Sequence, residues 1–174
     1  MKDNFSVRSD RYAKYRPSYP ETLFAHLDTL VPAKQNAWDC GTGNGQVAVE
    51  LAKRFGKVFA TDISAAQIEH AQQADNISYF VQSGEKTTFH DGQFDLITVA
   101  QAIHWFNFDA FYAEVRRTAK ENAILCVIGY GMALASEPIN RVVSELHDGT
   151  LGPYWYPESR FLDEHYSTIP FPFE

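Results

Sequence analysis

Apolar residues follow two spacings along the chain, and segments with the two spacings alternate. Short apolar runs, suited to buried strands, lie at residues 36–40, 57–63, 77–82, 94–102 and 123–130. Apolar residues three and four positions apart, typical of helices that bury one face, lie at residues 18–31, 46–55, 64–74 and 108–119. This alternation predicts an α/β fold with a mainly parallel, doubly wound sheet and right-handed crossovers.

Two of the predicted helices begin with a capping box, in which a serine is followed three residues later by a glutamate or a glutamine. These pairs are Ser18 with Glu21 and Ser64 with Gln67. A further helix is expected from Ser136, with Gly149 as a left-handed residue at its end. Residues 151–174 are rich in aromatic residues and proline, show no clear period and predict no final strand or helix.

The length of 174 residues favours a single domain over residues 1–174. Within it we expect an N-terminal segment and helix over residues 1–35, the core sheet over 36–130, and a helix with an aromatic tail over 131–174. The apolar fraction of 45% is that of an ordinary globular protein.

Charge and hydropathy exclude several classes of partner. The net charge of −7 disfavours nucleic acid, because an acidic surface repels the phosphate backbone. The sequence has neither a run of about 18 apolar residues nor the apolar core of a secretion signal, so we expect no membrane association and a cytoplasmic location. The two cysteines, Cys40 and Cys126, are too few for a zinc site of paired cysteines, and we expect free thiols and no bound metal.

The strongest chemical signal is the segment Asp39-Cys40-Gly41-Thr42-Gly43-Asn44-Gly45 between a predicted strand and a predicted helix. Its glycines allow a sharp turn beside a ligand, and the helix that follows offers free backbone N–H groups. The spacing G-x-G-x-G lacks the phase of the dinucleotide-binding turn. Asp39 suits a ligand with a positively charged amine, and Asp62, at the tip of the next strand, is placed to accept two ribose hydroxyls.

A tight strand-to-helix turn without a ligand is the alternative interpretation of these glycines. The register of the turn with Asp62 favours an adenosine-containing ligand instead. Together with residues 60–64, 81–85 and 94–106, the turn at 38–45 resembles the class I S-adenosylmethionine-dependent methyltransferases. It is most similar to the small-molecule type 11-like branch with trans-aconitate and ubiquinone-biosynthesis methyltransferases, over Tyr12 to about Tyr130.

The resemblance implies a Rossmann-like sheet with strand order 3-2-1-4-5, from which the last two of the usual seven strands are missing at a shortened C-terminus. It implies S-adenosyl-L-methionine as the cofactor and S-adenosyl-L-homocysteine as the product. The implied cofactor-binding residues are Tyr15, Arg16, Asp39, Gly41, Thr42, Gly43, Gly45, Asp62, Ile63, Ser83, Gly84, Glu85 and Gln101.

Individual roles follow from the same resemblance. The segment before the first helix would cover the cofactor, with Tyr15 shielding the methyl group and Arg16 pairing with the carboxylate; an ordinary helix lead-in is the alternative. Ile63 would stack on adenine, and residues 83–85 would surround the adenine edge, although an aspartate often stands at the position of Ser83. Gln101 would lie beneath the sulfonium.

Methyl transfer is an in-line displacement, so alignment in a dry pocket matters more than a catalytic triad. A general base helps only if the acceptor must lose a proton. His104, on the loop where acceptors bind in such folds, is either that base or a structural histidine, and Trp105 is either a pocket wall or a packing residue.

The favoured function is therefore methyl transfer to a small-molecule acceptor. The alternative is a non-catalytic S-adenosylmethionine-binding module that acts with a partner chain. In either case a second copy of the chain is a candidate to cover the open edge of the sheet. A nicotinamide-dependent oxidoreductase is disfavoured by the glycine phase and by Asp39.

Overall fold

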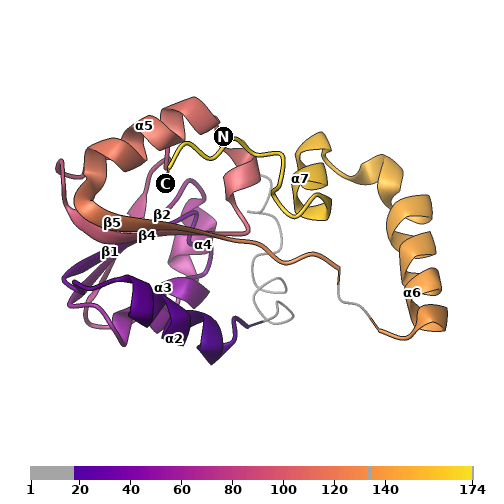
Figure 1. Cartoon of the computed structure of the whole chain (residues 1–174), viewed down its shortest axis with the longest axis horizontal. Coiled ribbons are helices and arrows are strands. Elements are labelled where there is room, and N and C mark those ends of the chain that lie inside the picture. The colour runs from indigo at the N-terminus through magenta and orange to yellow at the C-terminus, as the bar shows by residue number, and fades with distance from the viewer. Residues whose placement is uncertain (1–17, 133–134, 174) are drawn as a thin grey trace. The chain divides into compact units, whose positions relative to one another are not determined.

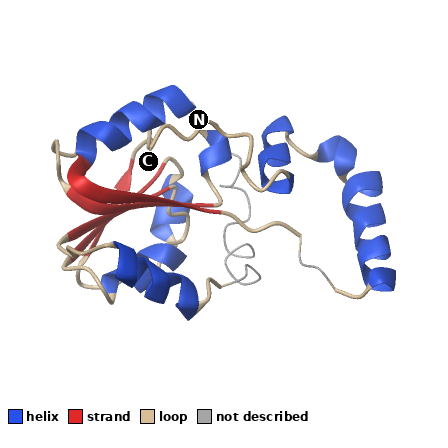
Figure 2. Ribbon diagram, viewed as in Figure 1, coloured by secondary structure: helices blue, strands red, loops and turns tan. Residues whose placement is uncertain are grey.

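A five-stranded parallel sheet is the centre of the computed structural model, which describes residues 18–132 and 135–173 (Figures 1 and 2). Its strands are β1 (Asn36–Cys40), β2 (Lys57–Asp62), β3 (Ile77–Val81), β4 (Phe94–Ala100) and β5 (Ala119–Ile128). They pair in the order β3-β2-β1-β4-β5, and all four pairs are parallel. The predicted fold class and strand order are confirmed.

Helices cover both faces of the sheet, with α2 and α3 on one face and α5 on the other (Figure 1). Within the described residues the α-helices are α2 (Glu21–Leu30), α3 (Gln46–Ala52), α4 (Ala65–Glu69), α5 (Phe108–Thr118), α6 (Glu137–Ser144) and α7 (Arg160–Asp163). Single turns of 3-10 helix cover Ile103–Trp105, Gly152–Tyr154 and Pro157–Ser159, and a π-helical turn covers Glu145–Thr150.

Alternate residues of β1 enter two different cores, as the two-residue period of a strand requires. Ala37 belongs to the apolar cluster that also contains Phe24 of α2 and Leu51 of α3. Trp38 points to the opposite face, where its ring lies 5.6 Å from Phe89 and 5.7 Å from Phe94. The first six residues of β4 are buried, which confirms the prediction of a strand covered on both faces.

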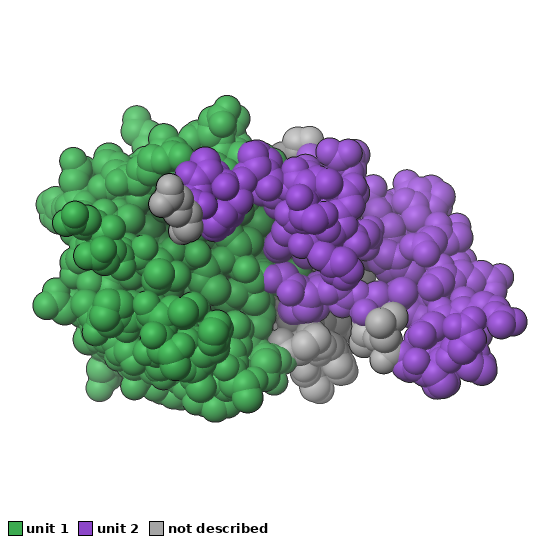
Figure 3. Space-filling view, viewed as in Figure 1, with its two compact units in different colours: residues 1–128 green, residues 129–174 purple. Residues whose placement is uncertain are grey.

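The chain divides into two compact units, residues 1–128 and residues 129–174 (Figure 3). The first unit contains the whole sheet and every predicted site residue that the structure describes. The second unit contains α6, α7 and the short turns between them. The expectation of a single domain stays a prediction.

Several predicted helix ends are wrong. Helix α2 begins at Glu21 with Pro20 as its N-cap and no capping side chain, so the predicted cap at Ser18 does not form. The second capping serine is confirmed, because Ser64 accepts a hydrogen bond of 3.3 Å from the amide of Gln67. Helix α4 ends at Glu69 instead of residue 74, and α3 ends at Ala52 instead of residue 55.

The C-terminal part of the prediction also needs correction. Gly149 lies within the π-helical turn and has no positive φ angle, so it is not a left-handed cap. The tail contains the short helix α7 and two 3-10 turns, where no element was expected. Cys40 is buried and Cys126 is half-buried, and both are free thiols. Within the described residues, no helix is both long and apolar enough to cross a membrane.

Candidate functional site

The site lies at the carboxyl ends of the strands, where the strand order reverses between β1 and β4. Asp39 of β1 stands opposite Thr98 of β4 in the register of the two strands. The Thr98 hydroxyl donates a hydrogen bond of 2.8 Å to Oδ1 of Asp39. Residues from both sides of the reversal therefore meet at the position where open α/β sheets bind ligands.

The turn after β1 requires glycine for conformational reasons. Gly41, Gly43 and Gly45 have φ angles of +70°, +55° and +82°, which side chains disfavour. A Cβ atom on Gly41 would also lie 2.7 Å from the Cβ of Ala102. The backbone amides of Gly41 and Thr42 each donate a hydrogen bond of 2.9 Å to the carbonyl of Thr61, so the turn is held against β2.

Asp39 is almost completely buried, with 1% of its surface exposed. Its Oδ2 accepts a hydrogen bond of 2.5 Å from the Thr42 hydroxyl, in addition to the bond from Thr98. The pKa of Asp39 is raised to about 6. Burial is the main cause, and the nearby charge of Asp62 acts in the same direction, whereas the hydrogen bonds from the two threonines lower the pKa. A nearby cation would stabilise the ionised form of such a buried carboxyl group. The protonated amine of an amino-acid ligand is a cation of this kind.

Asp62 ends β2 and faces the same turn. Its Oδ2 accepts a hydrogen bond of 2.9 Å from the amide of Gly43, and its Oδ1 accepts one of 2.9 Å from the amide of Ser64. The carboxylate thus lies between the glycine turn and the start of α4. Ile63, the next residue, is half-buried.

A small cavity of about 20 Å³ opens beside the turn. Its lining includes Asp39, Gly41 and Thr42, together with Tyr19 and Ala100. A volume of this size holds about one water molecule or one amino group. Of the predicted site residues, Asp39, Gly41 and Thr42 line this cavity. Asp62 lies next to the turn, through its hydrogen bond from the amide of Gly43.

Ser83, Gly84 and Glu85 begin the loop that follows β3. This loop adjoins the end of β2, because the amide of Gln82 donates a hydrogen bond of 2.9 Å to the carbonyl of Asp62. Gly84 is buried so tightly that a Cβ atom there would lie 2.3 Å from Sγ of Cys40. The predicted adenine-edge residues are therefore brought to the same edge of the sheet as Asp39 and Asp62.

Gln101 follows β4 directly and has a φ angle of +56°, which is uncommon for a residue other than glycine. Its amide donates a hydrogen bond of 2.8 Å to the carbonyl of Ile128, which anchors it to β5. His104 and Trp105 lie in the next turn, with ring centres 4.7 Å apart. His104 is 4% exposed, and Trp105 is half-buried. Tyr15 and Arg16 lie outside the described residues.

A family model described as a methyltransferase domain matches residues 38–127, which include the glycine turn, Asp62, the loop after β3 and Gln101. The chain belongs to the class I S-adenosylmethionine-dependent methyltransferases. This methyltransferase is 40% identical over 176 residues to a methyltransferase of Dictyostelium discoideum, in a match that covers 99% of the chain and 67% of the relative. The family named from the sequence is therefore confirmed.

Two further similarities fit this assignment. A structure from Anaeromyxobacter dehalogenans, described as a type II methyltransferase, matches with 38% identity and a TM-score of 0.83, over 92% of this chain and 68% of that chain. The malonyl-[acyl-carrier protein] O-methyltransferase of Haemophilus influenzae is 28% identical over 128 residues, which cover 70% of this chain and 49% of the relative. The methyltransferase thus spans between about half and two thirds of these proteins.

The cofactor of the family is S-adenosylmethionine, and the residues of this methyltransferase fit it. The buried carboxylate of Asp39 borders a cavity of about 20 Å³ and suits the amine of the cofactor. Asp62 offers acceptors for hydroxyl groups, and Gly41, which lines the cavity, places no side chain in it. Among the residues that the structure describes, no group of three or more His, Cys, Asp or Glu side chains is arranged to hold a metal ion.

Two contributors to the site were not predicted. Thr98 is completely buried and binds Asp39, and Tyr19 lines the small cavity from the segment just before α2. A hydroxyl within the mainly apolar run of β4 was the available signal for Thr98, because a buried polar group needs a partner. A larger cavity of about 410 Å³, lined by α3 and residues 72–76, contains none of the predicted site residues.

Proposed function

We propose that the chain transfers the methyl group of S-adenosylmethionine to a small-molecule acceptor. The observation that carries this proposal is the placement of two carboxylates, Asp39 and Asp62, on either side of a glycine turn with three positive φ angles. One carboxylate is buried and suits an amine, whereas the other accepts hydrogen bonds at the end of the next strand. The methionine part of the cofactor carries an amine and its ribose carries hydroxyls, which suit these two kinds of partner.

Each cofactor-binding residue has a role in this proposal. Asp39 holds the amine, and Gly41, Thr42, Gly43 and Gly45 pack against the methionine and ribose parts. Asp62 accepts the ribose hydroxyls, Ile63 stacks on adenine, and residues 83–85 border its edge. Gln101 lies beneath the sulfonium, while Tyr15 shields the methyl group and Arg16 pairs with the carboxylate.

The cofactor supplies a methyl group that is already activated by its positively charged sulfur. The protein aligns the acceptor and keeps water out, so no covalent intermediate on the chain is needed. We assign His104 as the base for an acceptor that must lose a proton, and Trp105 as a wall of the acceptor site. The net charge of −7 supports a small molecule over nucleic acid as the acceptor.

Calorimetric titration with S-adenosylmethionine and S-adenosylhomocysteine tests the cofactor site first. We expect saturable binding of both ligands by the native chain, and loss of binding in Asp62→Ala. A screen of small carboxylates, hydroxyl compounds and amines for products that gain one methyl group then tests the reaction. Absence of binding by correctly folded protein would refute the proposal.

Turnover also separates methyl transfer from the alternative of a non-catalytic module. Size-exclusion chromatography separates the monomer from any self-associated form, and both are assayed. If the chain binds S-adenosylmethionine but neither form methylates an acceptor, the result favours a non-catalytic module that acts through a partner chain. In a productive screen, His104→Gln is expected to lower kcat for an acceptor that loses a proton and to leave cofactor affinity unchanged.

A further inference from the structure

Residues 82–93 connect β3 to β4 without any helix, yet they are firmly tied to the rest of the first unit. The loop leaves β3 beside Asp62, and its buried Gly84 packs against Cys40 at the end of β1. At its far end, the amides of Gly92 and Gln93 donate hydrogen bonds of 2.9 Å and 2.7 Å to the last carbonyls of α5. The segment that borders the proposed adenine site is therefore shaped by contacts with α5.

Glu114 of α5 provides the central contact. Its Oε1 accepts hydrogen bonds of 2.7 Å from the amide of Thr87 and 2.5 Å from the Thr87 hydroxyl. The Glu114 side chain is only 9% exposed. Burying a carboxylate at such a position costs free energy unless it is paired and hydrogen-bonded. One backbone amide and one hydroxyl of the loop thus depend on a single carboxylate of the helix.

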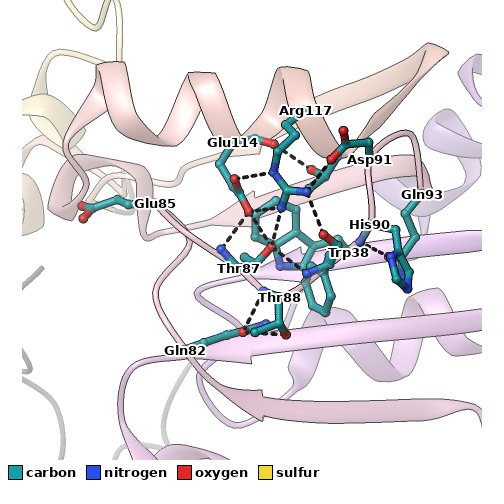
Figure 4. Close-up of polar contacts among 12 residues, drawn as sticks. Trp38, Gln82, Glu85, Thr87, Thr88, His90, Asp91, Gln93, Glu114 and Arg117 are labelled. Carbon is teal, nitrogen blue, oxygen red and sulfur yellow. Dashed lines mark hydrogen bonds and ion pairs between the residues drawn. The ribbon is translucent and has the colours of Figure 1, made fainter.

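Arg117, one turn further along α5, completes the cluster. Its Nε and Nη2 donate hydrogen bonds of 3.0 Å and 2.6 Å to the two oxygens of Glu114. Its Nη1 donates bonds of 2.7 Å to the carbonyl of Phe89 and 2.7 Å to the carboxylate of Asp91. Figure 4 shows the guanidinium between Glu114 and Asp91, so that the loop is held at Thr87, Phe89 and Asp91 together.

A second tie lies at the start of α5 and reaches the adenine-edge residues directly. Oε1 of Glu85 accepts a hydrogen bond of 2.8 Å from the amide of Asn107, the N-cap residue of α5. The helix therefore fixes the loop at Glu85, through its N-cap residue, and at Thr87, through Glu114. Gly84, between β3 and these two anchors, is closely packed and has little freedom to move.

Burial raises the pKa of Glu114, but hydrogen bonds from Arg117 and Thr87 outweigh burial and leave the pKa below its usual value. The carboxylate is therefore ionised at neutral pH. A buried ion pair often contributes less to stability than apolar residues of the same size, so a role in specifying loop geometry is a reasonable explanation for this one.

We propose that Glu114 is a positioning residue for cofactor selectivity: through Thr87 and Arg117 it sets the conformation in which residues 83–85 meet the edge of the adenine ring. This inference rests on the proposed function, because it presumes that adenine lies beside that loop. In this proposal Glu114 acts through Thr87 and Arg117 and not by direct contact with the cofactor. Glu114 affects how strongly the site prefers one nucleobase over another, and not how tightly it binds the methionine part of the cofactor.

The test compares the affinities for S-adenosylhomocysteine and S-inosylhomocysteine, which differ only at the edge of the base. We expect the native chain to prefer the adenine ligand. In Glu114→Gln, which keeps the size of the side chain but places an amide against Arg117, the preference should fall by about 2- to 30-fold. Thr87→Val removes the hydroxyl's bond to Glu114 and the weaker bonds that the hydroxyl accepts from the amide of Phe89 and from Arg117, but it keeps the bond from the Thr87 amide to Glu114. It should show a smaller fall in the same direction.

The exposed residue Glu121 offers a matched control, since Glu121→Gln makes the same chemical change outside the cluster. It should leave the preference unchanged. Hydrogen exchange should become faster over residues 82–89 in Glu114→Gln and stay unchanged in the control. If both ligands weaken by the same factor in Glu114→Gln, Glu114 only stabilises the fold and the inference is wrong.

The native chain separates this inference from the proposed function. Binding of neither ligand by folded native protein would overturn both. Binding of S-adenosylhomocysteine without any preference over S-inosylhomocysteine would leave the cofactor site standing and overturn the role of Glu114.

Discussion

The carboxylate of Asp62 accepts a hydrogen bond of 2.9 Å from the backbone amide of Gly43, so the residue that ends β2 holds the turn that follows β1. A second bond of 2.9 Å, from the amide of Ser64, fixes the other oxygen of Asp62. A carboxylate offers about four acceptor positions, more than these two amides use. Asp62 can therefore organise the turn and serve as an acceptor for ligand hydroxyls.

Asp62→Asn tests this dual role. One of its two oxygens becomes an NH₂ group, which then faces the amide of either Gly43 or Ser64. We expect the affinity for S-adenosylhomocysteine to fall by about 10- to 100-fold, in line with the loss of hydrogen bonds to a charged group. Calorimetric titration measures the change, and the exposed Asp75→Asn is the matched control. Native affinity in Asp62→Asn would mean that the carboxylate has no part in binding.

The strands and the glycine turn were predictable because local patterns determine them. A strand buried on both faces needs an apolar run, and the positive φ angles of the turn need glycine. The contact between Asp39 and Thr98 was not predictable, because these residues are 59 positions apart and meet only through strand pairing. The same is true of the network that ties Glu114 to Thr87.

The start of β5 illustrates why some boundaries were missed. The strand begins at Ala119, four residues before its apolar run, and includes the polar residues Lys120 and Glu121. Lys120 forms an ion pair of 2.7 Å with the buried Asp95 of β4. Backbone pairing along an edge strand does not require apolar side chains, so the hydropathy pattern alone could not locate this start.

The raised pKa of Asp39 makes stability depend on pH in a defined direction. Between its ordinary value of 3.8 and about 6, the folded protein keeps a proton that the unfolded chain has lost. Stability contributed by this group is therefore fully present below pH 3.8, declines as the pH rises through about 6, and is constant above. The difference between the two pKa values corresponds to about 3 kcal/mol, since each pKa unit is worth about 1.4 kcal/mol.

Asp39→Asn cannot ionise and should lack this dependence. Relative to the native protein, the variant should gain up to about 3 kcal/mol in free energy of unfolding between pH 4 and pH 7. Urea denaturation at both pH values measures the gain, and any constant cost of the substitution cancels in the difference. The variant should also lose the tightening of S-adenosylhomocysteine binding that we expect in the native chain as Asp39 ionises. An equal pH profile in both proteins would contradict the assignment.

Gln101 carries backbone strain at its φ angle of +56°, in the position where β4 leads into the proposed sulfonium site. Left-handed geometry costs about 1–3 kcal/mol for residues other than glycine and is worst for β-branched ones. Gln101→Val should therefore lower the free energy of unfolding by more than 1 kcal/mol relative to Gln101→Gly. Thermal unfolding of the two variants measures the difference, and equal melting temperatures would show that the angle imposes no strain.

The effects of substitutions at Gly84 and Cys40 on stability should be coupled, because a Cβ atom on Gly84 would lie 2.3 Å from the Cys40 sulfur. Gly84 has no positive φ angle, so steric overlap is the reason that a side chain is excluded. Gly84→Ala should destabilise the protein by about 1–3 kcal/mol, which is typical of overpacking. Cys40→Ala removes the sulfur and makes room for the new methyl group.

The double variant should therefore be more stable than the sum of the two single changes predicts, by about 0.5–3 kcal/mol. Urea denaturation of all four proteins measures this coupling. Cys126→Ala, made on the half-buried cysteine of β5, controls for the loss of a thiol and should show no coupling with Gly84→Ala. If the changes in free energy of unfolding for Gly84→Ala and Cys40→Ala simply add in the double variant, the loop after β3 can move away from β1. Affinity for S-adenosylhomocysteine should follow the same order, because Gly84 packs the loop of the proposed adenine site against the strand that carries Asp39.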